Sequence, residues 1–389
     1  MKLTYDLPEA VNMNAEKLDE METLTRKAID DNITAGMSAL VARHGKIVYH
    51  KTIGNLTLAP DSPPAPRDTI HPIMSVSKVM TAACIMILAD RGLLSPDDPV
   101  QQYIPEFQGE GKEAVRIHHL LTHTSGMYDD SIYRYWDEHK ETVSPPEHIP
   151  DYLPRTPEWW LCILGAPLVK PTGKEMSYSS IGYNMLGIIV RIVSGQDIDT
   201  FAKTNLFGPL GMKDTSYRKD ASQLEGRVIQ RRPPPGEQEN WISSPRCFDH
   251  VTPSGSVSST AYDLAIFGQM FLNGGEYDGV RVLSEDSVRL MTTNQIPGIP
   301  AVWGDEVFQE AAWGYGFNTS GVQDNFPTNR AYYHGGYAGS RLLIDPVLDI
   351  VIISLKSLHF IEEVDYPGVM EAAAEACNDS EECKTPPLS

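Results

Sequence analysis

The sequence has few basic residues and no long apolar run. Its 389 residues include 32 Lys and Arg against 52 Asp and Glu, a formal net charge of −20 at pH 7. This charge repels phosphate backbones and anionic lipid headgroups, so nucleic acids and membrane surfaces are poor candidate partners. No stretch of about 18 apolar residues occurs, and the N-terminal segment lacks the apolar core of a signal peptide. We therefore expect a cytoplasmic protein that acts on a small molecule, with its oligomeric state left open.

The sequence also lacks the patterns of a metal or disulfide protein. Its five cysteines contain no C-x-x-C pair, which argues against both a zinc site and a disulfide framework. The segment "HHLLTH" contains His118, His119 and His123, but the glutamate that a zinc-hydrolase helix carries between its histidines is missing. No metal or organic cofactor is expected.

Strand-like segments lie near both ends of the chain. Residues 37–54, "MSALVARHGKIVYHKTIG", predict two strands joined by a tight turn at "HG", and residues 330–357 predict three more strands. Before the first pair, apolar residues recur at helical spacing between positions 18 and 29, with Asn14 as a candidate N-cap. A last helix is expected within residues 362–377.

The middle of the chain has a helical pattern. Residues from about 75 to 270 predict mostly helices, joined by proline-dense connections at 144–160 and 231–245 that suit surface loops. Together these features predict an α+β fold of one domain, residues 1–389, with one antiparallel sheet built from both chain ends and flanked by helices. The sheet lobe would cover about 1–72 and 271–389 and an inserted, mostly helical lobe about 73–270, with the functional site between them.

A candidate nucleophile lies in "SVSK", residues 75–78, at the start of a long apolar run. Residues three apart share a helix face, so Ser75 and Lys78 can meet, whereas Ser77 and Lys78 point apart. A serine needs a nearby base, and a lysine can act as one when burial lowers its pKa from about 10.4. The alternative is a serine N-cap followed by a surface lysine.

Two later segments could complete a catalytic site. Tyr178 precedes an apolar helix in "MSYSSIGYNM", where its hydroxyl could relay a proton, although a half-buried tyrosine with a bonded hydroxyl is commoner. "YYHGGYAGS" sets His334 on a strand, with Gly335 and Gly336 allowing a ligand to approach the backbone. A glycine-kinked edge strand is the alternative there.

In this order and context, the three elements resemble the motifs of the serine β-lactamase and penicillin-binding-protein superfamily, whose signature begins with S-x-x-K. In its branch related to class C β-lactamases, the second motif is Y-x-N and the third can be H-x-G. Other segments are similar too, among them "VRIHHLLTHTSGM", "LFGPLGMKDTSY" and "WGYGF". The resemblance covers about residues 35–356 and implies a β-lactamase/transpeptidase-like fold.

The resemblance also implies roles for single residues. Ser75 would be the acylated nucleophile, Lys78 its proton acceptor or activator, and Tyr178 the second member of the proton relay. The backbone N–H groups of Ser75 and Tyr337 would form the oxyanion hole, where losing one donor usually costs about 3 kcal/mol. His334–Gly336 would be the strand that flanks the substrate.

The chain departs from the lactam-cleaving members at two positions. Ser180, a candidate substrate-binding residue by its position, stands where those members have an asparagine. Its hydroxyl cannot replace an amide's donor and acceptor pair. His334 replaces a lysine, which removes a fixed positive charge that would favour a carboxylate of the substrate. Both changes resemble the esterase and acyltransferase branch, including the fungal lovastatin-type acyltransferases.

The sequence therefore predicts a serine hydrolase that cleaves carboxylic esters, or else lactones or amides, through a Ser75 acyl-enzyme. The alternatives are an acyltransferase that uses an alcohol or amine, a β-lactamase or D-alanyl peptidase, and an inactive binding module. The last needs none of the three motif side chains, so their joint presence favours catalysis. An α/β-hydrolase is rejected because G-x-S-x-G is absent and "HGGY" follows the nucleophile.

Aromatic residues of the helical lobe form one further candidate group. They either line an apolar acyl pocket or pack a long loop onto the lobe, and the sequence does not separate these alternatives. The residues are Tyr133, Tyr135, Trp136, Trp159 and Trp160.

Overall fold

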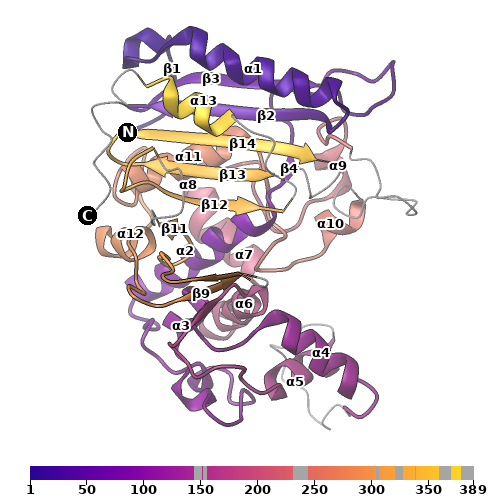
Figure 1. Cartoon of the computed structure of the whole chain (residues 1–389), viewed down its shortest axis with the longest axis vertical. Helices are drawn as coiled ribbons and strands as arrows, with labels where there is room; N and C mark the ends of the chain where they lie inside the picture. Colours follow the sequence, from indigo (N-terminus) through magenta and orange to yellow (C-terminus); the bar gives the residue numbers. More distant parts are fainter. Residues whose placement is uncertain are drawn as a thin grey trace.

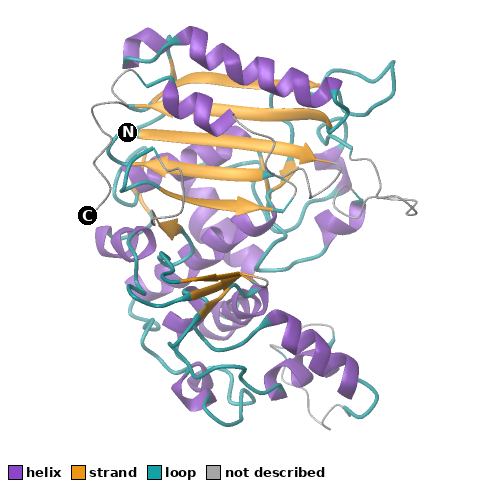
Figure 2. Cartoon of the chain, in the orientation of Figure 1, coloured by secondary structure: helices purple, strands orange, loops and turns teal. Residues whose placement is uncertain are grey.

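One large sheet is built from both ends of the chain, as the α+β prediction required (Figures 1 and 2). The structure is a computed structural model that describes residues 1–143, 151, 156–230, 244–303, 306–319, 327–337, 339–358 and 369–377. In spatial order the seven strands of this sheet are β1 (Thr4–Tyr5), β3 (Lys46–Gly54), β2 (Thr34–Arg43), β14 (Ile350–Leu358), β13 (Ser340–Asp345), β12 (Tyr332–Gly336) and β11 (Asn318–Thr319). All neighbours pair antiparallel except β1 and β3.

The predicted hairpin between β2 and β3 is confirmed. His44 and Gly45, with φ of 50° and 72°, form its two-residue connection. Two successive left-handed residues match the right-handed twist of the strands that they join. The predicted helix before it is α1 (Ala15–Asp30), and the Asn14 side chain accepts a hydrogen bond from the backbone N–H of Lys17 at 3.2 Å.

Helices cover both faces of the sheet. α1 and α13 (Val369–Glu375) pack together on one face, where α1 contacts β2 and β3 and α13 contacts β14. Figure 1 shows α13 in front of β2 and β14, with α1 along the top. α11 (Ala261–Leu272) packs against β2, β13 and β14 from the other face. Every residue of β2 is buried, as expected of a central strand covered on both sides.

The remaining helices form the lobe in the lower half of Figure 1 or connect it to the sheet. The short 3₁₀ or π segments are η1 (Pro8–Val11), η2 (Met74–Val76), η3 (Val100–Gln102), η4 (Lys112–Ala114) and η5 (Lys203–Phe207). The α-helices are α2 (Ser77–Asp90), α3 (Ile117–Leu121), α4 (Asp129–His139), α5 (Pro157–Gly165), α6 (Ser180–Ser194), α7 (Ile198–Ala202), α8 (Gly208–Leu210), α9 (Ala221–Leu224), α10 (Pro245–Asp249) and α12 (Glu285–Thr292).

Three small sheets complete the described structure. They are β4 (His71–Pro72) with β6 (Ser258–Ser259), β7 (Glu276–Tyr277) with β8 (Val280–Arg281), and β5 (Met176–Ser177) with β9 (Ala301–Trp303) and β10 (Glu306–Phe308). None of the helices in the described ranges is long and apolar enough to cross a bilayer.

The helix α2 lies at the centre of the molecule. All its side chains from Ser77 to Leu88 are buried, and it packs against α6, α7 and α12. One hydrophobic cluster extends from sheet residues such as Leu40 and Ile353 through α2 to Leu186 of α6. The sheet and the helical lobe therefore share a core, and the start of α2 lies between them.

Two segments lie on the other side of the predicted lobe boundary. α11 was placed by sequence in the 73–270 helical lobe. It packs instead on the sheet, where almost all its side chains are buried. β9, placed in the sheet lobe, pairs instead with β5 on one side and with β10 on the other. The proline-dense segments 144–150, 152–155 and 231–243, and the expected start of the last helix before Val369, lie outside the described residues.

Candidate active site

Ser75 and Lys78 meet at the start of α2, as their spacing predicted. Ser75 lies in η2, and the Lys78 ammonium or amine nitrogen Nζ is 3.2 Å from Ser75 Oγ. Met74, directly before the serine, has a φ of 48°, a left-handed conformation that costs a non-glycine residue free energy. This turn presents the Ser75 side chain, which is half-buried, on the same side as Lys78.

The strand β12 ends against this turn. A Cβ atom added to Gly336 would lie 2.3 Å from the carbonyl oxygen of Ile73, so only glycine permits the observed approach. Ser340, at the start of β13, donates a hydrogen bond to the carbonyl oxygen of Pro72 at 3.2 Å. The structure thus places the "HGG" strand beside Ser75, and Tyr337, at 43 % exposure, follows at its open end.

Lys78 is fully buried and has polar neighbours on three segments. Besides Ser75, its Nζ donates to the carbonyl oxygen of Ser254 at 3.0 Å and to Ser180 Oγ at 3.3 Å. Burial lowers the pKa of this amine to about 7, although the nearby Asp129 carboxylate acts in the opposite direction. Close to neutral pH, a substantial fraction of Lys78 is therefore an uncharged amine, the form that can accept a proton.

Tyr178 lies over Lys78, between β5 and α6. Lys78 Nζ is 4.7 Å from the centre of the tyrosine ring. Burial raises the pKa of the Tyr178 hydroxyl above its usual value, and a hydrogen bond with Ser75 offsets this only in part. Tyr178 is therefore protonated at neutral pH and can act first as a proton donor.

Aromatic rings hold Tyr178 from the other sides. Ring-centre distances are 4.5 Å to His123, 6.0 Å to Trp313 and 6.2 Å to His334. His123 is buried, and its Nδ1 accepts the backbone N–H of Ser179 at 3.0 Å, so the ring is a neutral Nε2–H tautomer. Burial, together with the charge of Lys78, keeps the pKa of His123 well below its usual range.

Asp129 fixes the turn that carries the second motif. Its carboxylate accepts hydrogen bonds from Ser179 Oγ at 2.6 Å and from the backbone N–H groups of Ser180 at 2.7 Å and Ile181 at 3.4 Å. Ser179 Oγ in turn caps α6 by accepting the N–H of Gly182 at 3.0 Å. Ser180, predicted as a substrate-side residue, is thereby directed to Lys78.

His334 is 3 % exposed and neutral. Its Nδ1 lies 2.6 Å from the carbonyl oxygen of Gly335 and donates to it. Burial, and secondly the charge of Lys78, lowers its pKa to about 3. β11 pairs only with Tyr332 and Tyr333, so the edge of β12 from His334 onward extends beyond it. His334 therefore adds no positive charge to the site at neutral pH.

The five aromatic residues that the sequence offered for either an acyl pocket or loop packing do not lie together as one group. Trp160 belongs to the hydrophobic core, while Tyr135 and Trp159 pack against that core where α4 meets α5. Tyr133 is 45 % exposed on α4, one turn after Asp129, and Trp136 is half-buried. Packing of the helical lobe accounts for three of these five side chains.

The histidines of "HHLLTH" are occupied by protein partners. His118 Nδ1 lies 2.9 Å from the Tyr315 hydroxyl, and His119 Nδ1 accepts the backbone N–H of Arg116 at 3.0 Å. Together with the Ser179 contact of His123, these bonds hold the segment in place. Within the described ranges, no three His, Cys, Asp or Glu side chains group as metal ligands.

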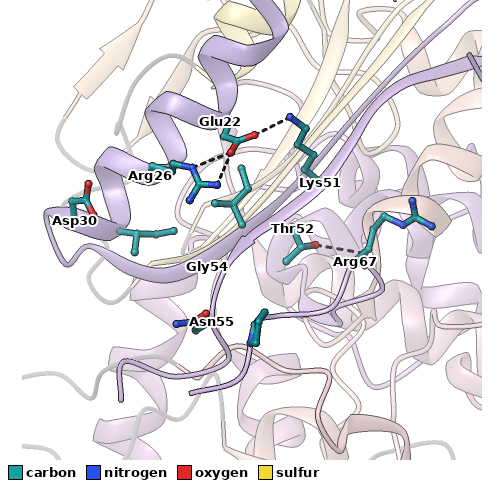
Figure 3. A pocket seen from close by; sticks show the side chains of 11 residues that line it. Glu22, Arg26, Asp30, Lys51, Thr52, Gly54, Asn55 and Arg67 are labelled. Carbon is teal, nitrogen blue, oxygen red and sulfur yellow. Dashed lines mark hydrogen bonds and ion pairs between the residues drawn. The ribbon is translucent and has the colours of Figure 1, made fainter. Parts of the chain in front are cut away.

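A surface pocket of about 660 Å³ lies away from this site, between α1, β3 and the segment that follows β3 (Figure 3). It is lined by none of the three motif residues. Glu22 accepts hydrogen bonds there from Arg26 at 2.9 and 2.6 Å and from Lys51 at 2.8 Å. Three of the charged side chains that line this pocket, Glu22, Arg26 and Lys51, are therefore paired with one another.

Sequence reasoning gave no role in the site to four of its contributors. Asp129 and the Ser254 carbonyl act on residues 50 or more positions away, and no local spacing marks them. Trp313 lies in "WGYGF", a segment that the resemblance had marked without giving it a role. His123 had been weighed as a metal ligand and lies in another segment that the resemblance marked, again without a role in the site.

Comparison with known proteins identifies relatives of similar sequence and fold. The chain is 28 % identical to Protein Rv1367c of Mycobacterium tuberculosis over 406 residues, covering 93 % of this chain and 94 % of that protein. A family VIII carboxylesterase structure matches with a TM-score of 0.72 at 20 % identity, covering 95 % of this chain and 98 % of that one. The octameric penicillin-binding protein homologue of Pyrococcus abyssi matches with a TM-score of 0.71 at 22 % identity, covering 94 % and 78 %. The model of the family named Beta-lactamase matches residues 21–362, and the chain therefore belongs to this family, whose wider superfamily consists of serine hydrolases.

Proposed function

We propose that this protein hydrolyses carboxylic esters through an acyl-enzyme on Ser75. The observation that carries the proposal is the contact between Ser75 Oγ and the buried Lys78 Nζ, whose pKa burial lowers to about 7. A serine hydroxyl becomes a nucleophile when such a base accepts its proton.

The proton steps follow from the protonation states. The neutral Lys78 amine takes the Ser75 proton while Oγ bonds to the substrate carbonyl carbon. Backbone N–H groups of Ser75 and Tyr337 are the proposed donors to the resulting oxyanion. Tyr178, protonated and bonded to Ser75, gives a proton to the departing alkoxide and regains one from the Lys78 ammonium. Water then repeats the sequence on the acyl-enzyme, and Ser75 is restored.

The preference for esters rests on charge and hydrogen bonding. The neutral His334 offers no positive charge to a carboxylate at this position, and Ser180 Oγ is already directed to Lys78. An ester also has a better leaving group than an amide, so a site with modest substrate anchoring suits it. The fold does not distinguish ester cleavage from amide cleavage, because the carboxylesterase and the penicillin-binding protein homologue match about equally well.

Intact-mass measurement tests the proposal. Wild-type protein is mixed briefly with a p-nitrophenyl acyl ester, alone and with a competing alcohol, and in parallel with a penicillin. A transient mass gain lost to water supports an esterase, whereas transfer to the alcohol shows an acyltransferase. A lasting penicillin adduct without ester turnover would instead assign the site to the peptidases.

The pH dependence of kcat/KM should show an acid limb with a midpoint near 7. Lys78 must be unprotonated to act, so the rate should rise with pH and fall about tenfold per unit well below the midpoint. Because the pKa of Tyr178 is raised, no loss from its ionisation is expected below about pH 10. Stopped-flow or plate assays with p-nitrophenyl esters measure the profile after correction for spontaneous hydrolysis. A rate that falls between pH 6 and 8 would contradict this assignment.

Replacing Tyr178 with phenylalanine should lower kcat by about 10²- to 10⁴-fold, the usual contribution of a general acid or base. The ring stays to fill the space between His123 and Trp313, so the fold should be kept. The loss should be smaller for a p-nitrophenyl ester than for an ethyl ester, because p-nitrophenolate leaves without a proton. Equal losses for both would show that Tyr178 does not protonate the leaving group.

A further inference from the structure

Asp129 contacts Ser179 and Ser180 of the second motif, and the Ser180 hydroxyl in turn lies 3.3 Å from Lys78 Nζ. Asp129 is the first residue of α4, and it is named by none of the three sequence motifs. We infer that Asp129 is a positioning residue of this site: its carboxylate fixes the Ser179–Ser180 turn against Lys78 and supplies the negative charge that stabilises the Lys78 ammonium. The inference rests on the proposed function, because the ammonium forms when Ser75 is deprotonated.

The Asp129 carboxylate holds the start of α6 through its hydrogen bonds. Burial raises the pKa of this carboxyl, while the hydrogen bonds to its oxygens and the charge of Lys78 favour the ionised form. All three of its hydrogen bonds are accepted, one from the Ser179 hydroxyl and two from backbone N–H groups in the first turn of α6. The first N–H groups of a helix lack intrahelical partners and favour negative charge. Asp129 therefore joins α4 to the start of α6 and fixes the direction in which Ser180 Oγ meets Lys78.

Among the described residues, Asp129 is the charged group that raises the pKa of Lys78. Burial dominates the pKa of the amine, and Asp129 is the charge that opposes it. Burial likewise keeps the neighbouring histidines neutral and the neighbouring tyrosines protonated. Within the described ranges, the other ionisable groups facing Lys78 are His123, His334, Tyr178 and Tyr183.

Removing this charge should therefore change the base as well as the geometry. In Asp129→Asn the amide can still accept one backbone N–H bond, but nothing compensates the buried ammonium. The acid limb of kcat/KM should move to lower pH by on the order of one unit. The plateau should fall about tenfold or more, because Lys78 becomes a weaker base. A residue with a purely structural role would lower the plateau without moving the limb.

Two further variants separate charge from shape. Asp130→Asn removes the same charge from the next residue, whose side chain is exposed, and should keep the wild-type limb and plateau. Asp129→Glu keeps the charge but displaces the carboxylate by one methylene, so it should lower the plateau with a limb near that of wild type. Should Asp129→Asn fail to fold, Asp129→Ser, a residue suited to a helix start, takes its place.

A readout independent of turnover completes the test. In protein labelled with ¹³Cε-lysine, the Lys78 resonance is identified by its loss in Lys78→Met and is followed as the pH changes. The inference expects a lower titration midpoint in Asp129→Asn than in wild type and no change in Asp130→Asn. An unchanged midpoint in folded Asp129→Asn overturns it. A shifted midpoint in a protein without Ser75-dependent turnover would instead overturn the proposed function and leave the electrostatic role standing.

Discussion

Replacing Ser75 with alanine should lower kcat/KM for a p-nitrophenyl ester by about 10⁴-fold or more and should abolish the acyl mass gain. Lys78, Tyr178 and the oxyanion donors remain in this variant, but no atom is left to form the acyl bond. What survives should be the smaller acceleration that binding and the oxyanion site give to attack by water. The measurement is steady-state hydrolysis beside intact mass on the same preparation.

The second serine of "SVSK" provides the matched control. Ser77 Oγ is buried and accepts the backbone N–H of Val257 at 2.9 Å, on a different side from Lys78. Ser77→Ala should keep acylation and most turnover while losing about 1–3 kcal/mol of stability, since a buried N–H loses its partner. If Ser75→Ala kept more than a tenth of the wild-type activity, or Ser77→Ala abolished the adduct, Ser75 would not be the nucleophile.

Replacing Lys78 with methionine should lower kcat/KM by about 10³-fold or more while leaving the fold intact. A general base contributes about 10²- to 10⁴-fold, and Lys78 also serves the step that removes the acyl group. Methionine fills most of the buried volume without an amine, which makes it a better test than alanine. Pre-steady-state measurement should show slowing of both acylation and deacylation.

Lys78→Met should also change how stability depends on pH. The pKa of Lys78 is about 7 in the folded protein and about 10.4 in an unfolded chain, so the unfolded state binds more protons between these values. The free energy of unfolding of the wild type should therefore gain a contribution that rises with pH from 7 to 10. Lys78→Met lacks this contribution, and at pH 7 it should be at least as stable as wild type. Denaturant titrations at pH 7 and 9 measure both effects, and parallel pH dependences would contradict the buried, neutralised amine.

The sequence predicted those parts of the site that local spacing encodes. Ser75 and Lys78 are three residues apart on one helix start, so their contact follows from helix geometry. Likewise, "HG" between two alternating segments predicted the hairpin, and Asn14 predicted the cap of α1. In each case the interacting residues are neighbours in the chain.

Other features depend on packing between distant segments. The contact of Asp129 with Ser179 joins residues 50 positions apart, and no periodicity relates them. α11 was assigned to the helical lobe because a mostly apolar helix can be buried against either a sheet or other helices. The protonation states of Lys78 and Tyr178 depend on burial, which becomes known only once the lobes are assembled.

The burial of α2 limits how new substrate ranges can arise on this scaffold. From Ser77 to Leu88 the helix has no exposed side chain, so a substitution there alters the core before it alters the site. The base Lys78 thus lies in a part of the chain where variation is costly, and the nucleophile Ser75 lies in the turn directly before it. Variation that reshapes substrate choice is cheaper at exposed positions near the site, such as Tyr133 of α4 and Tyr337 after β12. One chemical step can in this way be kept constant while the molecules it acts on diverge.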